Sequence, residues 1–267
     1  MLKKSLLLIA LTLGFSTDVL LTNLVAVAKP ASNVSVTRTR NNNKTGRRGI
    51  LGFKVPKVRP SGNREGGAAR GACSPQDISA VLPPRPKNLE ITKAPVDSTL
   101  SDHPTFFVNI PQSSAKQAEF LLKDENNEEL LREDIDLGSS NGLVSYTLPK
   151  SFKGLEVGKK YIWRFSLLCN QDDRSANPRT SAWIQRVEPS PQVAQQLQAA
   201  IDDLERSAIY AEFGFWQETL KSLVDLRVAN PNDQTIAESW NNVLKSVELA
   251  SLAQKPVFQV TGVPSDL

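Results

Sequence analysis

One stretch of the sequence, residues 155–169, constrains the fold more than any other. After the turn residues Val157-Gly158, large or apolar side chains occupy every second position, namely Tyr161, Trp163, Phe165, Leu167 and Cys169. Side chains of a β-strand alternate between its two faces, so this spacing gathers the large residues on one face. The pattern predicts the central strand of a β-sandwich core, with that face turned inward.

Further short strands are expected around this one, each bounded by turn residues. They are residues 105–110, 118–123, 129–135, 143–148 and 180–187. Six strands at this spacing indicate an antiparallel β-sandwich of the immunoglobulin or fibronectin III type over residues 73–189. Leu155, Gly158 and Tyr161 have the spacing that precedes a core strand in fibronectin III domains, where the tyrosine hydroxyl caps the preceding corner. An ordinary exposed tyrosine at a strand start is the alternative.

The apolar residues change to a helical period at residue 190, and we expect three helices in residues 190–255. Gly214 ends the first helix, Asn230-Pro231 ends the second, and Asp233 caps the third. Residues 256–267 then have the composition of a loose tail. The predicted fold class is therefore α+β, with a sandwich followed by a helical region.

The first two of these helices resemble a single tetratricopeptide repeat at four positions, which are Tyr210, Gly214, Leu223 and Pro231. Thr219 departs from the repeat, which usually has a small alanine there. A lone repeat cannot bury its apolar face by stacking on a second copy. We therefore expect the helices to dock on each other and on the sandwich, with Trp216 and Trp240 in the core rather than in a ligand platform.

The N-terminus has the pattern of a secretory signal peptide. Lys3-Lys4 precedes an apolar run at residues 5–15, and Ala26-Val27-Ala28 supplies the small residues that signal peptidase reads. A permanent membrane anchor is the alternative, but Asp18 lies near the middle of that window, where a carboxylate costs roughly 2.5–3.5 kcal/mol. We expect residues 1–28 to be cleaved after Ala28 and the chain to be exported, to the periplasm or the extracellular space.

Residues 29–72 are strongly basic, with eleven Lys and Arg residues against one acid, whereas the whole chain has a net charge of +4. Such a composition buries too little apolar surface to fold, so a disordered arm is predicted. The arm either binds an anionic envelope glycan or lipid headgroup, or is a solvated spacer; nucleic acid is not expected as a partner. Its candidate anion-binding residues are Arg38, Arg40, Arg47, Arg48, Lys54, Lys57 and Arg59.

The two cysteines, Cys73 and Cys169, are an even number in a chain predicted to be exported, which favours one disulfide. The bond would tie the start of the folded body to its central strand. The alternative is two free thiols, one of them reactive.

The residues able to support chemistry form no recognisable catalytic or metal site. A single histidine excludes a histidine-based zinc cage. Ser113-Ser114-Ala115-Lys116 fits the Ser-x-x-Lys pattern of penicillin-recognising enzymes, but their partner motifs are missing and the segment also fits a polar loop. His103 is expected to be structural, because a general base needs a defined neighbour. We predict no catalytic residue, metal or cofactor, and favour a protein that is not an enzyme.

An ordered set of motifs resembles a secreted cyanobacterial family known as domain of unknown function 928. The set comprises Arg70-Gly71-Ala72-Cys73, Pro104-Thr105-Phe106-Phe107-Val108, Glu119-Phe120, Tyr161-Ile162-Trp163-Arg164-Phe165, Cys169 with Arg174, Trp183-Ile184-Gln185-Arg186 and Tyr210-Ala211-Glu212-Phe213-Gly214-Phe215-Trp216. The chain departs from the family pattern at Ala182 and at Gln217-Glu218. The resemblance implies export in a cyanobacterium, and it implies no particular activity.

These observations favour a non-catalytic binding or scaffolding module of the cell envelope. Its partner would be an envelope protein or an anionic envelope polymer, held by the helix faces or by residues 170–179. One alternative is a hydrolase of envelope material whose site is assembled only in the fold. Another is a component of a secreted signalling or stress complex that is recruited through the helices. We expect the chain to contact the membrane only transiently, through the signal peptide. The sequence does not predict the oligomeric state.

Overall fold

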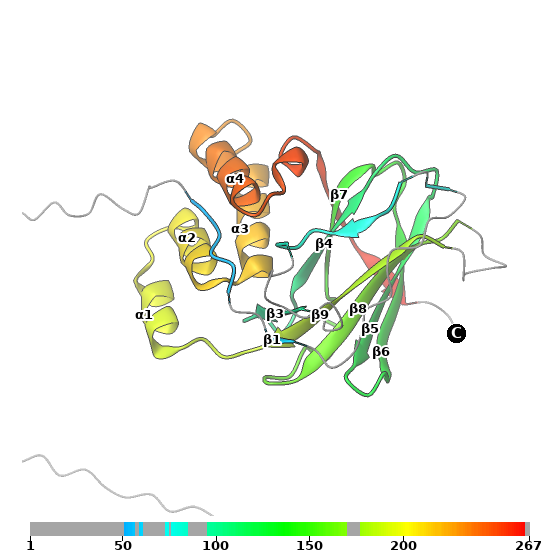
Figure 1. The fold of residues 1–267 in the computed structure, drawn as a ribbon, viewed down its shortest axis with the longest axis horizontal. Coiled ribbons are helices and arrows are strands. Elements are labelled where there is room, and N and C mark those ends of the chain that lie inside the picture. The colour runs from blue at the N-terminus through cyan, green and yellow to red at the C-terminus, as the bar shows by residue number, and fades with distance from the viewer. Residues whose placement is uncertain are drawn as a thin grey trace, which may run out of the picture. The chain divides into compact units, whose positions relative to one another are not determined.

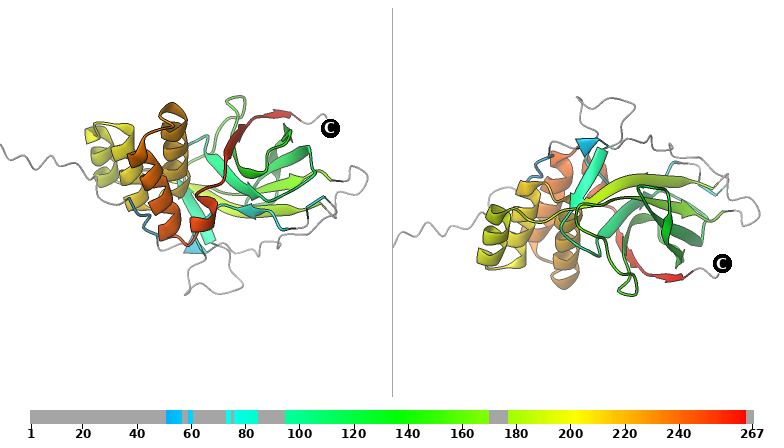
Figure 2. Two further views of the ribbon diagram at one scale, coloured as in Figure 1. Left: turned by 90° about the horizontal axis from the view of Figure 1, so that it is seen from above. Right: turned by 90° about the horizontal axis from the view of Figure 1, so that it is seen from below.

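The computed structural model describes residues 51–56, 59–60, 73–74, 76–84, 95–169 and 177–264. All of them belong to one of the two units of the chain, residues 43–267, which is described here by itself. Two β-sheets face each other, and helices gather beside one end of them (Figures 1 and 2). The predicted signal peptide and most of the predicted arm lie outside the described residues.

The two sheets contain all six predicted strands. These are β4 (Thr105–Ile110), β5 (Gln117–Asp124), β6 (Glu129–Asp136), β7 (Gly142–Thr147), β8 (Lys160–Leu167) and β9 (Arg179–Arg186). Five short strands without a prediction join them: β1 (Arg59–Pro60), β2 (Ser79–Ala80), β3 (Pro95–Thr99), β10 (Val257–Val260) and β11 (Gly262–Pro264). The strand orders are β1-β3-β9-β8-β5-β6-β11 and β10-β7-β4-β2.

Each sheet contains one parallel pair, so the prediction of a purely antiparallel sandwich is wrong at these two places. β3 runs parallel to β9, and β10 runs parallel to β7. A parallel pair needs a long connection, because the chain must return to the same end of the sheet. Strands β4 to β8 separate β3 from β9 in the chain, and strands β8 and β9 with the helical region separate β7 from β10.

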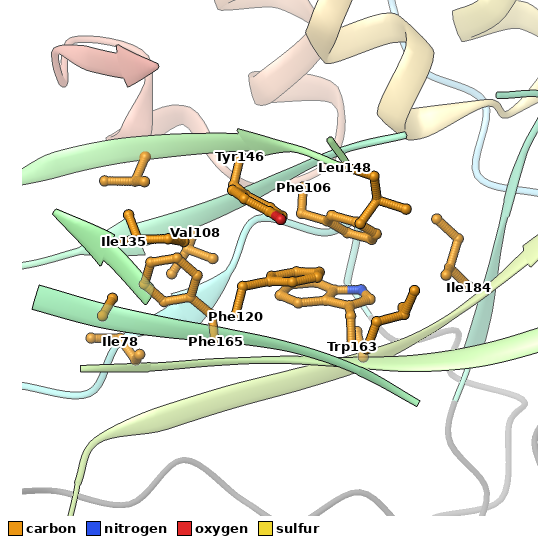
Figure 3. Close-up of a cluster of buried hydrophobic side chains, with 14 of the residues drawn as sticks. Ile78, Phe106, Val108, Phe120, Ile135, Tyr146, Leu148, Trp163, Phe165 and Ile184 are labelled. Atoms are coloured by element: carbon orange, nitrogen blue, oxygen red, sulfur yellow. The ribbon is translucent and has the colours of Figure 1, made fainter. Parts of the chain in front are cut away.

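The sandwich core lies around β8, as the alternating pattern predicts. Tyr161, Trp163, Phe165 and Leu167 are all buried in the main apolar cluster. The Trp163 ring packs 5.0 Å from the Phe106 ring of the opposite sheet (Figure 3). Rings packed in this way add to the stability that area burial alone provides. The predicted tyrosine corner is also confirmed, because the Glu156 N–H donates to the Tyr161 hydroxyl at 2.9 Å.

The helical region contains four α-helices, where three were predicted. They are α1 (Pro191–Ala199), α2 (Asp203–Phe213), α3 (Trp216–Ala229) and α4 (Gln234–Ser246), and a short 3-10 helix, η2 (Ala250–Leu252), follows. The predicted first helix is broken at residues 200–202. Asp202 caps α2 by accepting from the Glu205 N–H at 2.7 Å, and the Glu205 carboxylate accepts from the Ile201 N–H at 3.0 Å. These two bonds satisfy donors at the start of α2, so a new helix begins there.

A second apolar cluster joins the helices to the four-stranded sheet. Trp216 and Trp240 are buried in it, as predicted, and the Trp240 indole donates to the Ala253 carbonyl at 3.0 Å. Phe53 packs edge-on against Trp216, with 4.8 Å between the ring centroids. The expectation of disorder throughout residues 29–72 is therefore wrong for residues 51–56. The average composition of the arm is polar, but Leu51 and Phe53 supply apolar surface within it, and both are buried.

The predicted loose tail is also corrected. Residues 257–260 add β10 to the four-stranded sheet, and residues 262–264 add β11 to the seven-stranded sheet. The tail therefore joins the edges of both sheets (Figure 2). Phe258 and Val260 of β10 pack against the main apolar cluster.

The predicted disulfide between Cys73 and Cys169 is present, with 5.4 Å between the two Cα atoms. The Ser113 hydroxyl donates to the Cys73 carbonyl at 3.1 Å, and the Ser114 N–H donates to the same oxygen at 3.0 Å. The Ser-x-x-Lys segment thus serves as a loop that holds the start of the body beside the end of β8.

Candidate functional site

A cavity of about 310 Å³ lies where the connection between β3 and β4 meets helices α2 and α3. Residues of polar or charged type predominate in its wall, which is formed by Ser101, His103, Pro104, Thr105, Tyr210, Gln217, Glu218, Lys221, Ser222 and Asp225. Cavities of this size, lined by a few convergent polar groups, are the usual form of small-ligand sites.

The turn between α2 and α3 brings the polar residues of the wall together. Gly214 ends α2 with a φ of +79°, a conformation that favours glycine, and α3 begins two residues later. Trp216 then anchors α3, because its indole N–H donates to the Val81 carbonyl at 2.7 Å. As a result Gln217 and Glu218, in the first turn of α3, border the same cavity as Tyr210 from the end of α2.

The Glu218 carboxylate is fixed through one of its two oxygens. Oε1 accepts from the Thr99 hydroxyl at 2.5 Å, from the Leu100 N–H at 2.6 Å and from the Ser101 N–H at 3.1 Å. Oε2 is buried and has no hydrogen-bond partner among the described residues. Burial raises the pKa of Glu218, and the three hydrogen bonds to Oε1 oppose that rise.

The neighbouring Gln217 is the least satisfied polar side chain of the wall. The residue is only 2% exposed, and neither its amide nitrogen nor its amide oxygen finds a partner within the described ranges. A buried polar group left unpaired costs about 1–3 kcal/mol, and such groups are rare in native proteins. The amide offers donors on its nitrogen and an acceptor on its oxygen, and the described residues pair with neither.

Tyr210 contributes a hydroxyl that stays protonated. Burial raises the pKa of Tyr210, and the nearby Glu218 carboxylate raises it further, against the opposite effect of the Arg206 guanidinium. The hydroxyl can therefore donate as well as accept at any physiological pH.

Most of the remaining polar groups of the wall are engaged with the protein itself. His103 Nε2 lies 2.9 Å from the Phe152 carbonyl oxygen, whereas the buried Nδ1 makes no hydrogen bond within the described residues, although Asp102 Oδ1 lies 2.9 Å away. Lys221 and Asp225 form an ion pair, and the Ser222 hydroxyl donates to the Glu218 carbonyl at 2.8 Å. Among the residues of the wall, the buried polar atoms without a partner in the described ranges are thus the two amide atoms of Gln217, Glu218 Oε2 and His103 Nδ1.

The family model of Domain of Unknown Function (DUF928) matches residues 65–257, which is most of the chain. The chain belongs to the DUF928 family. The match includes strands β2 to β9 and all four helices, so the cavity lies within the family domain. No curated protein matches this DUF928 sequence.

The DUF928 chain has a second, smaller cavity of about 170 Å³ on the outer face of the seven-stranded sheet. Lys123, Arg164 and Arg179 line it, together with Leu121, Asn127, Ile162 and Ser181. Lys123 donates to Asn127 at 3.3 Å and Arg179 has an interaction of its own, so only part of this basic surface is available.

The anion-binding residues predicted for the DUF928 chain fall mostly outside the described residues, namely Arg38, Arg40, Arg47, Arg48 and Lys57. Lys54 is described, and its ammonium group lies 3.7 Å from Glu212 at the surface. Arg59 belongs to β1. Within the described ranges, no group of three or more His, Cys, Asp or Glu residues could hold a metal ion, and no helix is long and apolar enough to cross a membrane.

Sequence reasoning missed Gln217 and Glu218 as site residues. The sequence carries a weak signal for them, because two polar residues directly follow a core tryptophan in the first turn of a helix. What makes them a candidate site is the approach of β3 from more than a hundred residues earlier in the chain, which no local pattern reveals.

Proposed function

We propose that this DUF928 protein is an exported binding module of the cell envelope, which holds a small polar ligand in the cavity between β3 and α3. The unpaired Gln217 amide and Glu218 Oε2, on adjacent residues that line the cavity, carry the proposal. Buried polar groups are rarely left unpaired in a native fold, so a ligand that pairs with these groups as the wall adjusts would satisfy them.

Export is supported by the signal-peptide pattern of residues 1–28, with cleavage after Ala28, and by the disulfide. Disulfides persist in oxidising compartments and are rare in the cytosol. The basic residues 29–50 would then lie between the cleavage site and the folded body, where they serve either as a spacer or as a contact for an anionic envelope polymer.

A non-catalytic role fits the wall better than hydrolysis does. Glycoside hydrolysis usually needs two carboxyl groups, and Asp225 of the wall is paired with Lys221. Nucleophilic catalysis needs a hydroxyl beside a base, whereas Ser222 donates to a main-chain carbonyl and His103 Nε2 lies 2.9 Å from the Phe152 carbonyl oxygen.

An envelope hydrolase remains the second candidate, because Glu218 has a raised pKa at the wall of a cavity. A carboxyl group in such a position is suited to act as a general acid. The substrate would be an envelope glycan, and the protein would release soluble products from it.

Recruitment through the helices is the least supported role. The likeness of α2 and α3 to a single tetratricopeptide repeat, like that of the sandwich to immunoglobulin or fibronectin III domains, stays a proposal. Residues 51–56 already pack on this helix pair, with Phe53 against Trp216 and the Lys54 N–H donating to the Ala211 carbonyl at 3.0 Å. A partner peptide would have to displace them.

Co-sedimentation of the full chain with isolated cell-envelope material tests the proposal. We expect the wild-type protein to sediment with the envelope and Gln217→Met to sediment markedly less. The exposed Gln198 allows a matched control, Gln198→Met, which should behave as wild type. Equal sedimentation of all three proteins would contradict a role for the cavity.

Two further experiments distinguish the alternatives. A deletion of residues 29–50, which spares the buried Leu51 and Phe53, should leave binding intact if the cavity is responsible. If the deletion or high salt abolishes binding, electrostatic docking of the arm is the function instead. Release of soluble glycan by the wild type but not by Glu218→Gln would establish the hydrolase.

A further inference from the structure

We infer that the smaller cavity, on the outer face of the seven-stranded sheet, binds a tetrahedral oxyanion, that is, a phosphate or sulfate group. This site goes beyond the proposed function, because it lies on another face of the molecule and shares no residue with the cavity beside α3. Lys123 and Arg164 are the residues expected to hold the anion, through charged groups that are accessible to a ligand.

The polar groups of the wall are mainly hydrogen-bond donors. Besides the apolar Leu121 and Ile162, the wall consists of two arginines, one lysine, Ser181 and Asn127. Asn127 Oδ1 already accepts from Lys123 Nζ at 3.3 Å, and the amide nitrogen keeps two hydrogens to donate. None of the described residues that line the cavity is an acid. The wall therefore matches a ligand that accepts hydrogen bonds and is negatively charged.

The three cations of the wall stand on three neighbouring strands. Arg164 of β8 lies opposite Leu121 of β5 on one side and opposite Ser181 of β9 on the other. Lys123 follows two residues after Leu121, and Arg179 precedes Ser181 by two residues, so each is a diagonal neighbour of Arg164. Diagonal neighbours are about 7–8 Å apart, which long side chains can reach across. One anion can therefore contact these charges together.

The charged group of Arg164 is accessible and has no hydrogen bond to the described residues. The side chain is half-buried, yet none of its nitrogens is among the buried polar atoms without a partner, so each nitrogen has surface open to a ligand. Its five N–H donors are available. Lys123 gives one of its three ammonium hydrogens to Asn127 and keeps two. Arg179 has an interaction of its own, and here only its positive charge is counted.

Two acids near the cavity, Glu119 and Glu129, are bound by Arg132 of β6. Arg132 donates to both carboxylate oxygens of Glu129 and to Oε2 of Glu119. The hydrogen bond from Arg132 lowers the pKa of Glu129, and the charges of Lys123 and Arg164 lower it further. Because these two carboxylates are opposed by Arg132 as well as by the three cations of the wall, positive charge is left over for an anion.

A tetrahedral oxyanion suits this wall better than other ligands do. A metal cation or an ammonium ion would meet donors and like charge. A neutral ligand would leave the neighbouring positive charges uncompensated. A carboxylate has two oxygens, whereas phosphate and sulfate have four, which can accept from several charged donors at once. The ligand group is therefore a phosphate or a sulfate.

The size of the cavity fits the charged group alone. Its volume is about 170 Å³, below the range of about 300–1,000 Å³ that sites for whole small molecules have. A phosphate or sulfate would fill it, while any sugar or other moiety attached to that group would remain outside. The group is therefore either a free ion or the terminal group of a larger molecule, and the same donors recognise both.

An NMR titration of the isotope-labelled full chain tests the site. Inorganic phosphate and sulfate, at an ionic strength held constant with chloride, should shift the amide signals of β5, β8 and β9 around the cavity and the Nε–H signal of Arg164. Acetate should bind about tenfold more weakly. Shifts confined to the basic residues 29–50, no shifts at all, or equal binding of acetate would overturn the inference.

Variants then assign the binding to this cavity. Arg164→Gln should weaken phosphate binding about tenfold or more, and Lys123→Gln should weaken it severalfold. The two side chains lie on the outer face of the sheet, so Lys123→Gln serves if Arg164→Gln does not fold. Lys245→Gln removes one positive charge from an exposed position of α4 and should not change the affinity. Equal weakening by all three substitutions would reduce the effect to net charge and refute the site.

Two further measurements distinguish a free ion from the terminal group of a larger molecule. If glucose 6-phosphate binds at least as tightly as inorganic phosphate, the cavity takes a terminal group; if only the inorganic ions bind, the ion itself is the ligand. Lower co-sedimentation of Arg164→Gln, but not of Lys245→Gln, with isolated envelopes would place the group on an envelope polymer. The proposed function is tested separately by Gln217→Met, which should leave phosphate binding unchanged.

Discussion

The indole N–H of Trp216 donates a hydrogen bond to the main-chain carbonyl of Val81, with 2.7 Å between nitrogen and oxygen. This bond joins the first turn of α3 to the segment that leads from β2, 135 residues earlier in the chain. It fixes the start of α3, on which Gln217 and Glu218 depend for their position.

Replacing Trp216 with Phe should keep the aromatic ring in the core and remove only the donor. The buried Val81 carbonyl would then be unpaired, and we expect the free energy of unfolding to fall by about 1–3 kcal/mol beyond the small loss of ring area. Urea denaturation measures this change. The corresponding Trp240→Phe variant, which leaves the Ala253 carbonyl unpaired, should lose a similar amount, and stabilities equal to wild type would contradict the role of these bonds.

Phe53 should contribute to stability as a core residue although it lies in a basic segment. Phe53→Ala removes a ring that packs on Trp216, and we expect a loss of about 3–5 kcal/mol. Val55, two residues later, is 42% exposed and offers a control, since Val55→Ala should change the stability little. Equal effects of the two substitutions would show that residues 51–56 do not pack as described.

The disulfide between Cys73 and Cys169 closes a loop with a sequence separation of 96 residues. In the chain-entropy model a loop of this length contributes up to about 4.7 kcal/mol, and measured values are often lower. Replacing both cysteines with serine should lower the urea midpoint to that of the reduced wild-type protein. A reducing agent should have no effect on the double variant, which serves as its own control.

The free energy of unfolding should decrease as the pH rises, because two carboxyl groups have a raised pKa in the folded protein. Removal from water raises the pKa of Asp97, on β3, to about 7, and burial also raises the pKa of Glu218. An acid whose folded pKa lies above its unfolded value stabilises the fold at low pH, where both states are protonated, and that contribution is lost as the pH rises towards the folded pKa. The decline for Asp97 should therefore fall between about pH 4 and pH 7.

Asp97→Asn should flatten this part of the profile, since asparagine has the same shape and does not ionise. The free energy of unfolding, measured by urea denaturation from pH 4 to pH 8, gives the slope for each protein. A wild-type stability that rises with pH over this window, or an unchanged slope in Asp97→Asn, would contradict the expectation.

Much of the sandwich could be predicted because its strands carry their own signal. Tyr161, Trp163 and Phe165 alternate with smaller or polar residues, and that alternation is a local property of a half-buried strand. Strands β10 and β11 have no such signal, since they are short edge strands whose pairing depends on partners more than a hundred residues away. Asp202 and Glu205 did carry a capping signal, but a continuous helical period across residues 193–211 obscured it.

The candidate site could not be predicted for a different physical reason. Gln and Glu in the first turn of a helix ordinarily face solvent, and the sequence offers nothing to distinguish Gln217 from such a residue. Its burial arises because β3 and the β3–β4 connection pack against α3, and only the assembled fold shows that its amide then has no partner.

Gly262 in β11 should not tolerate a side chain. A Cβ atom there would come within 2.7 Å of the Glu133 Cβ and would also strike the Glu133 carboxylate, which accepts from the buried Tyr146 hydroxyl at 2.7 Å. We expect Gly262→Ala to lower the free energy of unfolding by about 1–3 kcal/mol, with Val263→Ala, at a 64% exposed neighbour, as the control. Equal stability of the two variants, measured by thermal unfolding, would contradict this contact.

The two C-terminal strands also fix the order in which the chain can complete its fold. Neither sheet has its full set of strands until residues 257–264 have left the ribosome, because β10 and β11 supply an edge to each sheet. Until then the edges of β6 and β7 are open, and the long-range pairings that close them form slowly. Both sheets can thus be completed only after the whole helical region has been synthesised.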